Sequence, residues 1–191
     1  MEHLKQKLLE SSRVLEGGIL QVDHFLKQQC DMVLIDRLAT EFAARYAADG
    51  VTKVLAVEVS GIPVAALTAA KLRVPLVYAT RAKQGSAGAH LLAAKIETAN
   101  GALSADLVVP REYICDTDRV LVIDDFLAQG STLLALLDLV AISGATTVGC
   151  GVMVEKAFCG GGEQVCARGV RLESLAKIAD MSFDKGIVFA D

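Results

Sequence analysis

Two adjacent carboxylates and a run of small, hydroxyl-bearing residues stand close together in VLVIDDFLAQGST, residues 120–132. Asp124 and Asp125 directly follow an apolar strand, where they could accept hydrogen bonds from sugar hydroxyls or hold Mg²⁺ through water. The AQGST segment then enters a helix, whose first N–H groups and positive dipole end favour a phosphate. Gly130 permits close approach of the backbone, and the two residues after it add hydroxyl donors. The alternative is that one of these hydroxyls merely caps the helix.

A ligand with hydroxyls at one end and a phosphate a few ångströms away would satisfy both features. Ribose 5-phosphate is such a ligand. The segment is not a Walker sequence, because GxxxxGK[ST] is absent, and it is not the GxGxxG dinucleotide fingerprint.

Predicted strands and helices alternate from residue 31 to residue 155. The spacing of apolar residues predicts an amphipathic helix over 31–50, with Asp31 as its N-cap and Gly50 as its stop. A second helix is predicted for IPVAALTAAKL and a third for STLLALLDLVAISG. Residues 51–61 are predicted to form a buried strand ending at Glu58 and then a turn. Further strands are predicted at 74–79, 146–155 and 170–178, and HLLAAKIET with ADLVVPREYI suggests a hairpin.

This alternation predicts a parallel α/β sheet with helices on both faces. In such sheets, ligands bind beyond the carboxyl ends of the strands. The loops after Glu58, Ala79, Ile123 and Glu155 are therefore expected along one rim. TRAKQGSAGA, residues 80–89, is polar and small without apolar periodicity, so it is predicted to be a mobile loop.

Composition excludes several classes of protein. The chain of 191 residues suits one domain, and its formal net charge of -4, without a basic arm, disfavours nucleic-acid binding. The sequence has neither a signal-peptide core at its start nor an apolar run long enough for a bilayer, so no membrane partner is expected. The five cysteines are scattered without a CxxC pair, which is typical of free cytosolic thiols.

VLVIDDFLAQGST resembles the phosphoribosyl-pyrophosphate (PRPP) motif of the type I phosphoribosyltransferases. LEGGILQVDHFLKQQCD, VEVSGI, VMVEKAF and VRLESLAKI are similar, in order and spacing, to the xanthine-using branch of that family. The resemblance covers nearly the whole chain and is weakest from about residue 80 to 118. It implies the type I fold, a mostly parallel central sheet flanked by helices with a small hood. It also implies one domain over 1–191, with 1–30 and 156–191 contributing to the hood and the base pocket.

The resemblance also implies roles for individual residues. The ribose hydroxyls would contact Asp124 and Asp125, and the 5-phosphate would lie on Ala128, Gln129, Gly130, Ser131 and Thr132. The pyrophosphate loop would be Glu58, Val59, Ser60 and Gly61. A flexible loop with Arg81 and Lys83 would close over the pyrophosphate, and the purine pocket would include Leu20, Lys27 and Lys156. Mg²⁺ would bridge the pyrophosphate and the ribose, with the two aspartates as candidate protein ligands.

Several of these residues also have simpler interpretations. Glu58 could be a solvated strand end, Lys156 a surface lysine, and Arg81 with Lys83 a solvated basic loop. Leu20 would be a core residue in either case.

The chain departs from the family pattern at three places. Position 27 is Lys, where the xanthine enzymes carry a small amide or hydroxyl, so the base preference could differ. Position 128 is Ala, where the hypoxanthine-guanine relatives have an aspartate proposed as general base, so no protein general base is assigned. The loop at 80–90 is rich in Ala and Gly and lacks the more polar family pattern.

The expected activity is transfer of a 5-phosphoribosyl group from PRPP to xanthine in purine salvage, in a cytoplasmic homodimer. Two alternatives stay open: a phosphoribosyltransferase for another purine, and a non-catalytic PRPP-sensing regulator.

Overall fold

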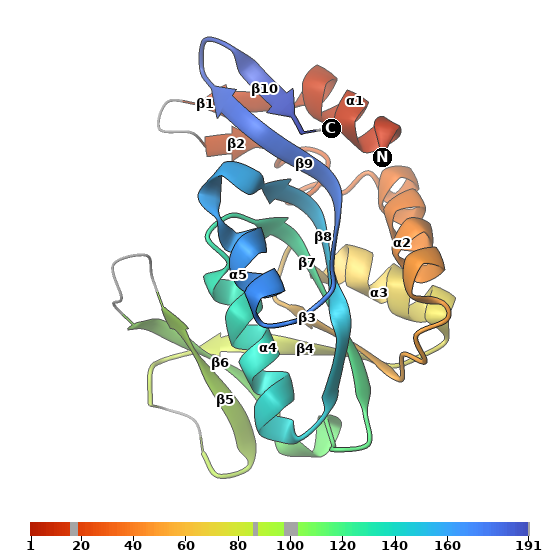
Figure 1. Cartoon of the computed structure of the whole chain (residues 1–191), viewed down its shortest axis with the longest axis vertical. Helices are drawn as coiled ribbons and strands as arrows, with labels where there is room; N and C mark the ends of the chain where they lie inside the picture. Colours follow the sequence, from red (N-terminus) through yellow and green to blue (C-terminus); the bar gives the residue numbers. More distant parts are fainter. Residues whose placement is uncertain (16–18, 86–87, 98–102, 191) are drawn as a thin grey trace.

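The computed structural model describes residues 1–15, 19–85, 88–97 and 103–190. Its centre is an eight-stranded sheet with the order β10-β9-β8-β7-β3-β4-β6-β5 (Figure 1). Five neighbouring strands run parallel: β9 (Leu172–Ser182), β8 (Thr146–Lys156), β7 (Arg119–Leu127), β3 (Lys53–Val57) and β4 (Leu76–Ala82). The edges are antiparallel, with β10 (Gly186–Phe189) on one side and β6 (Leu103–Pro110) with β5 (Leu91–Glu97) on the other. The predicted mostly parallel sheet is confirmed.

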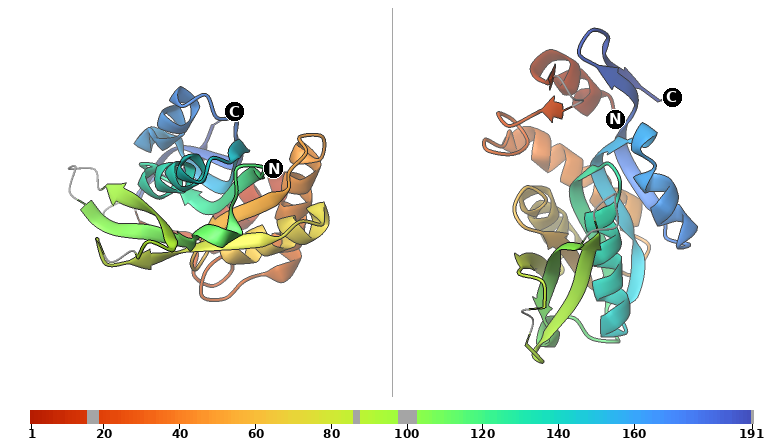
Figure 2. Two further views of the ribbon diagram at one scale, coloured as in Figure 1. Left: turned by 90° about the horizontal axis from the view of Figure 1, so that it is seen from below. Right: turned by 90° about the vertical axis from the view of Figure 1, so that its left-hand side faces the viewer.

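Helices cover both faces of this sheet (Figures 1 and 2). Successive residues of a strand point to opposite faces, and β3 shows this directly. Val54 and Ala56 belong to the core cluster of α2 (Met32–Tyr46) and α3 (Ile62–Leu72). Leu55 and Val57 belong to a second cluster with α4 (Ser131–Ser143), and α5 (Gly161–Ala167) lies beside α4. The run of apolar residues in β3 is therefore explained by a strand buried on both sides.

The boundaries of α2 confirm one sequence prediction and correct another. Asp31 is the N-cap, and its Oδ1 accepts a hydrogen bond of 3.1 Å from the Leu34 N–H. The helix ends at Tyr46, so Gly50 is not its stop. Gly50 instead lies in the turn before β3 with a φ of +63°, a conformation that glycine adopts without steric cost.

A small layer above the carboxyl ends of the strands contains both ends of the chain (Figure 1). It comprises α1 (Glu2–Ser11), the hairpin of β1 (Arg13–Leu15) and β2 (Ile19–Gln21), and the outer part of β9 with β10. Leu4 and Leu8 are buried on the inner side of α1, and the N-terminal amine donates to the Leu175 carbonyl at 2.9 Å. Among the described residues, none of the helices is long and apolar enough to cross a bilayer.

The predicted hairpin is confirmed as β5 and β6, while the predicted loop at 80–89 begins later than expected. Thr80, Arg81 and Ala82 belong to β4, because they pair with Val108, Leu107 and Asp106 of β6. This pairing joins residues far apart in the sequence, so local polarity could not indicate it. Residues 86–87 of the loop lie outside the described residues. Two short 3-10 helices, Arg111–Tyr113 and Ala157–Cys159, complete the chain.

Candidate active site

The two acidic residues are inside strand β7 and do not follow it, which corrects the sequence analysis. β8 continues alongside, with Asp124 opposite Val152 and Leu127 opposite Glu155, so the strand extends to Leu127. Asp124 is 4% exposed and Asp125 is 7% exposed, and the Asp125 N–H donates to Asp124 Oδ1 at 2.9 Å.

This burial changes the acidity of the pair. Burial raises the pKa of Asp124 well above its usual range, the adjacent Asp125 carboxylate adds to this, and the charge of Arg81 opposes it. Two buried carboxylates side by side are costly without a ligand, so a sugar hydroxyl or a cation at this point would be favoured.

The segment after β7 leads into the start of a helix that has no side-chain cap. Residues 128–130 connect β7 to α4, whose N-cap is Gly130 with a φ of +88° and no side-chain cap. The alternative that Ser131 or Thr132 merely caps the helix is therefore wrong. Because the first N–H groups of a helix have no partner within it, the start of α4 offers donors and the positive dipole end to an anion. These donors lie next to the carboxylates of β7.

Helix α5, to which the sequence analysis assigned no role, forms hydrogen bonds with this loop. The Gly161 N–H donates to the Ala128 carbonyl at 3.0 Å, and Gln164 Nε2 donates to the Gln129 carbonyl at 3.2 Å. A Cβ placed on Gly130 would lie 3.2 Å from Gly161 Cα, so the two backbones are nearly in contact. The run CGGG at 159–162 was the only sequence signal for such a close approach.

The loop after β3 lies on the other side of the acidic pair. It runs from Glu58 to Gly61, includes a cis peptide bond between Glu58 and Val59, and leads into α3. A Cβ on Gly61 would lie 3.1 Å from Asp124 Oδ1, so this loop touches the carboxylate. The starts of α3 and α4 therefore flank Asp124 from neighbouring strands.

Glu58 is not a solvated strand end. Its Oε1 accepts a hydrogen bond of 2.8 Å from the Arg81 N–H, and its carbonyl accepts one of 3.2 Å from the Arg81 guanidinium. Arg81 is therefore fixed at the end of β4, next to the loop of Glu58. Lys83 directly follows this strand.

Two lysines lie on the side of the acidic pair that faces the N-terminal layer. Lys27 Nζ is 3.8 Å from Asp125 Oδ2 and 5.2 Å from the centroid of the Phe126 ring. Lys156 is the last residue of β8; burial lowers its pKa, Cys159 opposes this, and the charge of Lys27 lowers the pKa further. The two amines therefore influence each other. Leu20 is buried in the core cluster against which Phe126 packs.

The two carboxylates suit a metal ion that is coordinated mainly by the bound substrate and by water. Among the described residues, no group of three or more His, Cys, Asp or Glu side chains is arranged to hold an ion. Asp125 Oδ2 is buried without a hydrogen-bond partner in the described part of the chain. Mg²⁺ keeps several waters and commonly takes only one or two protein carboxylates together with substrate phosphates. The donor set of Asp124 and Asp125 fits this pattern.

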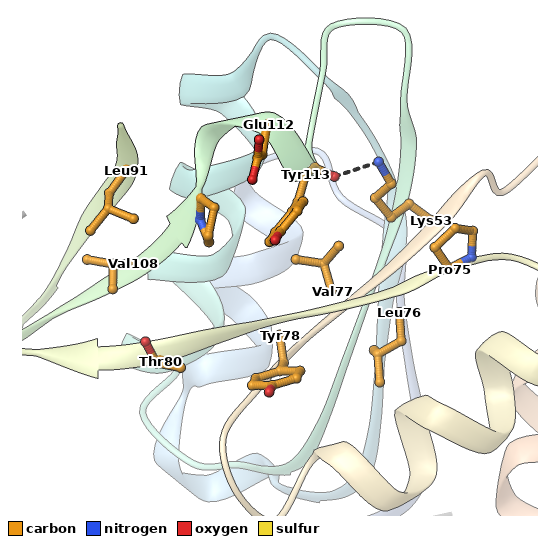
Figure 3. A pocket seen from close by; sticks show the side chains of 11 residues that line it. Lys53, Pro75, Leu76, Val77, Tyr78, Thr80, Leu91, Val108, Glu112 and Tyr113 are labelled. Atoms are coloured by element: carbon orange, nitrogen blue, oxygen red, sulfur yellow. Dashed lines mark hydrogen bonds between the residues drawn. The ribbon is translucent and has the colours of Figure 1, made fainter. Parts of the chain in front are cut away.

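A separate cavity of about 690 Å³ lies away from these residues, along the outer edge of β4 (Figure 3). Tyr78 and Tyr113 are each 50% exposed there, and Lys53 binds the Tyr113 carbonyl at 2.6 Å. The lining is largely apolar, and its only carboxylate among the described residues is Glu112, so it lacks the carboxylate pair that marks the site at Asp124 and Asp125.

Comparison with known proteins agrees with this geometry. Residues 22–177 match the phosphoribosyl transferase domain, and the chain belongs to this family. Xanthine phosphoribosyltransferase of Moorella thermoacetica is 40% identical over 95% of this chain and 93% of its own. The enzyme of the same name from Lachnoclostridium phytofermentans is 38% identical over 98% and 97%.

Solved structures show the same fold at lower identity. Adenine phosphoribosyltransferase of Thermoanaerobacter pseudethanolicus has a TM-score of 0.74 at 22% identity, covering 92% of this chain and 98% of that one. The Giardia lamblia enzyme has a TM-score of 0.74 at 23% identity, covering 86% and 89%. At these identities the likeness supports the architecture alone.

Proposed function

We propose that this chain is a purine salvage enzyme that transfers the 5-phosphoribosyl group of PRPP to xanthine, giving xanthosine 5'-monophosphate and pyrophosphate. The observation that carries the proposal is the position of Asp124, flanked by the starts of α3 and α4. Two anion-binding loops on either side of a carboxylate pair suit a ligand with a phosphate, a ribose and a pyrophosphate in that order. Relatives at 38–40% identity that are named xanthine phosphoribosyltransferase support the choice of base.

Each loop then binds one part of the substrate. Asp124 and Asp125 hold the ribose hydroxyls, and residues 128–132 cradle the 5-phosphate with backbone N–H groups. Residues 58–61 bind the pyrophosphate. Arg81 belongs to β4 and is held by Glu58, so it is not part of a closing loop as the sequence suggested; with Lys83, which follows the strand, it adds positive charge beside the pyrophosphate. Leu20, Lys27 and Lys156 form the purine end, between the hood of residues 1–30 and the segment 156–191.

The reaction replaces one bond at the ribose C1′. The bond from C1′ to the pyrophosphate oxygen breaks, the electron pair leaves with pyrophosphate, and a purine nitrogen forms the new bond to C1′. Between these events C1′ has oxocarbenium character, so the protein contributes mainly orientation and electrostatic stabilisation. When bound, Mg²⁺ would neutralise charge on the departing pyrophosphate, with Asp124 and Asp125 as its protein-side ligands.

The chain is also proposed to act in the cytoplasm as a homodimer. All five cysteines are free, which suits a reducing compartment, and cell fractionation would test this.

The cavity beside β4 supports the dimer. In the described register, β4 pairs with β6 only through Thr80–Ala82, which leaves the preceding edge open beside exposed Tyr78 and Tyr113. A two-fold axis beside this cavity would bring the open edge and the two tyrosines of a second copy onto the same apolar lining (Figure 3).

Light scattering coupled to size exclusion tests the dimer. Tyr78→Glu is expected to give a monomer, while Val188→Glu, at an exposed apolar residue of β10, is expected to keep the dimer. A wild-type monomer, or a Tyr78→Glu dimer, would contradict the proposal.

Pyrophosphate release with PRPP–Mg²⁺ and a panel of bases tests the activity. Xanthine is expected to give the highest kcat/KM among xanthine, guanine, hypoxanthine, adenine and orotate. If another purine leads, the substrate assignment fails while the phosphoribosyl transfer stands. If PRPP binds but no base releases pyrophosphate, the alternative of a PRPP-sensing regulator is favoured. The formal net charge of -4 speaks against that alternative, because it disfavours a nucleic-acid partner.

A further inference from the structure

Asp106 is a buried carboxylate outside the site described above. It lies in the middle of β6, opposite Ala82, the last residue of β4, and it is only 5% exposed. Its neighbours Leu107 and Val109 alternate in exposure to the core cluster of α4, so the Asp106 side chain points to the other face of the sheet. Because burying a carboxylate is costly, an apolar residue would suit a purely structural position in this strand better.

The Asp106 carboxylate holds the chain just beyond the end of β4. Its Oδ2 accepts a hydrogen bond of 2.7 Å from the Gly85 N–H. Gly85 has a φ of +72°, a conformation that glycine adopts without steric cost, and the chain turns at this residue. The other oxygen, Oδ1, is buried without a hydrogen-bond partner in the described part of the chain. The role of the carboxylate is therefore to be sought at Gly85.

A second carboxylate holds the other end of the same short segment. Glu58 Oε1 accepts a hydrogen bond of 2.8 Å from the Arg81 N–H, just as Asp106 Oδ2 accepts one from the Gly85 N–H four residues later. Lys83 is the midpoint between these two N–H groups. Two fixed points so close together leave few φ/ψ combinations to the residues between them. The backbone at Lys83 is therefore held from both sides.

We propose that Asp106 is a positioning residue for the phosphoribosyl transfer, which fixes Lys83 beside the pyrophosphate by holding the Gly85 N–H. This inference rests on the proposed function, in which residues 58–61 bind the pyrophosphate. A lysine amine is a point charge on a flexible stem, so a backbone that is already ordered reduces the entropy lost when the amine binds a phosphate oxygen. In this role Asp106 makes no contact with the substrate and acts through Gly85 and Lys83.

Substitutions at Asp106 test the hydrogen bond itself. Asp106→Ala removes the acceptor of the Gly85 N–H. It should raise KM for PRPP and the dissociation constant of Mg²⁺–pyrophosphate, measured by titration calorimetry, by about 10-fold each. Asp106→Val, whose branched side chain suits a buried strand, should give the same rise. Asp106→Asn keeps an acceptor oxygen and should change both values by less than about threefold. All three should leave KM for xanthine at saturating PRPP near the wild-type value.

A double-mutant cycle tests whether Asp106 acts through Lys83. Lys83→Met removes the amine but keeps an unbranched side chain, and it should raise KM for PRPP by itself. If Asp106 places that amine, Asp106→Ala should add little to the loss in Lys83→Met, although it costs about 10-fold in the wild type. Losses that multiply in the double variant would overturn the inference, because they would mean that Asp106 acts independently of Lys83.

Asp118→Ala is the matched control. Asp118 is also a buried carboxylate that accepts a backbone N–H, from Cys115 at 2.9 Å, but it lies directly before β7, away from the carboxyl ends of the strands. This variant should lower Tm without raising KM for PRPP.

The remaining outcomes separate the inference from the proposed function. An unchanged KM for PRPP in Asp106→Ala and Asp106→Val, or an equal rise in Asp106→Asn, would overturn the positioning role while the transfer activity stands. If the wild type neither binds Mg²⁺–pyrophosphate nor uses any purine with PRPP, the proposed function itself fails.

Discussion

Arg81 and Glu58 are joined by two hydrogen bonds that link neighbouring loops of the site. The Arg81 N–H donates to Glu58 Oε1 at 2.8 Å, and its guanidinium donates to the Glu58 carbonyl at 3.2 Å. The proposed pyrophosphate loop and the last residues of β4 therefore hold each other in place. The Arg81 guanidinium lies beside this loop, whose backbone leads into the start of α3. The guanidinium and the loop could therefore bind the same highly charged anion.

The first prediction concerns this link. Glu58→Ala removes the acceptor of the Arg81 N–H, so the loop loses one positioning contact and KM for PRPP should rise by about 10-fold. Glu58→Gln keeps an acceptor oxygen and should change KM much less. Steady-state kinetics with varied PRPP at saturating xanthine would measure both. Equal KM values for the two variants would show that the hydrogen bond does not position the loop.

The second prediction separates function from stability at Asp124. Because the pKa of Asp124 is raised in the fold by burial and by Asp125, the folded protein binds this proton more tightly than the unfolded chain. The contribution of this proton to the stability of the fold is therefore fully present below the ordinary carboxyl pKa of 3.8. It is lost as the pH rises towards the pKa of Asp124 in the folded protein. Asn does not titrate, and its Oδ1 can still accept from the Asp125 N–H.

Asp124→Asn should thus raise the Tm of the ligand-free protein at neutral pH while lowering kcat/KM for PRPP. The gain in Tm is about 2–4 °C for each kcal/mol relieved, and it should shrink as the pH falls towards the ordinary carboxyl value. Calorimetry over a pH series measures the difference. A variant that is less stable at neutral pH, or one with full activity, would contradict the assignment.

Local patterns were sufficient to predict the central elements of the fold. Apolar runs and helical spacing located β3, β7, β8, α2 and α3. Each of these is a continuous segment, and the pattern of apolar residues within it indicates which residues are buried. The acidic pair and the phosphate loop were predicted for the same reason, since they lie within thirteen consecutive residues, Val120–Thr132. The predicted and observed strands differ only at their ends, because pairing with β8 extends β7 past the two aspartates to Leu127.

Contacts between distant segments could not be predicted from the sequence. The extension of β4 to Ala82 depends on β6, and the ion pair of Lys27 with Asp125 joins an N-terminal loop to the central strand. The contact of Gly161 with Ala128 depends on the close packing of α5 against α4. In each case the partner is set by strand order and helix packing. The CGGG run at 159–162 indicates a close approach of two backbones but does not indicate which segment approaches.

The third prediction concerns an ion pair at the opposite end of β7. Burial alone would raise the pKa of Asp118, but hydrogen bonds from the Cys115 N–H at 2.9 Å and Lys53 Nζ at 2.7 Å, with others from the Cys115 thiol and Thr52, lower it to about 2. This group stabilises the fold above its ordinary pKa of 3.8, and the contribution is lost as the pH falls from there to about 2.

Asp118→Asn should therefore cost roughly 1–2 kcal/mol at neutral pH, or about 2–4 °C in Tm for each kcal/mol. The difference from the wild type should narrow as the pH falls below 3.8. Urea unfolding at several pH values measures it. Because Asp118 lies away from the carboxyl ends of the strands, KM for PRPP should stay unchanged well below Tm. A difference in stability that does not depend on pH would contradict this account.

The fourth prediction tests whether α5 positions the phosphate loop. A Cβ on Gly161 would collide with the Ala128 carbonyl and lie 2.8 Å from the Gln129 carbonyl carbon and the Gly130 nitrogen. All three are backbone atoms, so they cannot rotate away as the end of a side chain can, and the whole loop must shift. Such overpacking costs about 1–3 kcal/mol. A displacement of the loop should also raise KM for PRPP by about 10- to 100-fold, because charge-assisted contacts to the 5-phosphate depend on position.

Gly162→Ala is the matched control, since it adds the same methyl group to the next residue of the same helix. Its Cβ would meet the carboxylate of Glu155, the end of a flexible side chain that accepts a hydrogen bond of 2.5 Å from Ser174 Oγ. This variant should lose stability without a comparable rise in KM for PRPP, because Glu155 can rotate without moving residues 128–130. Calorimetry and PRPP kinetics on both variants separate the two effects. If both variants change KM equally, or Gly161→Ala leaves it unchanged, then α5 only stabilises the fold and does not position the phosphate loop.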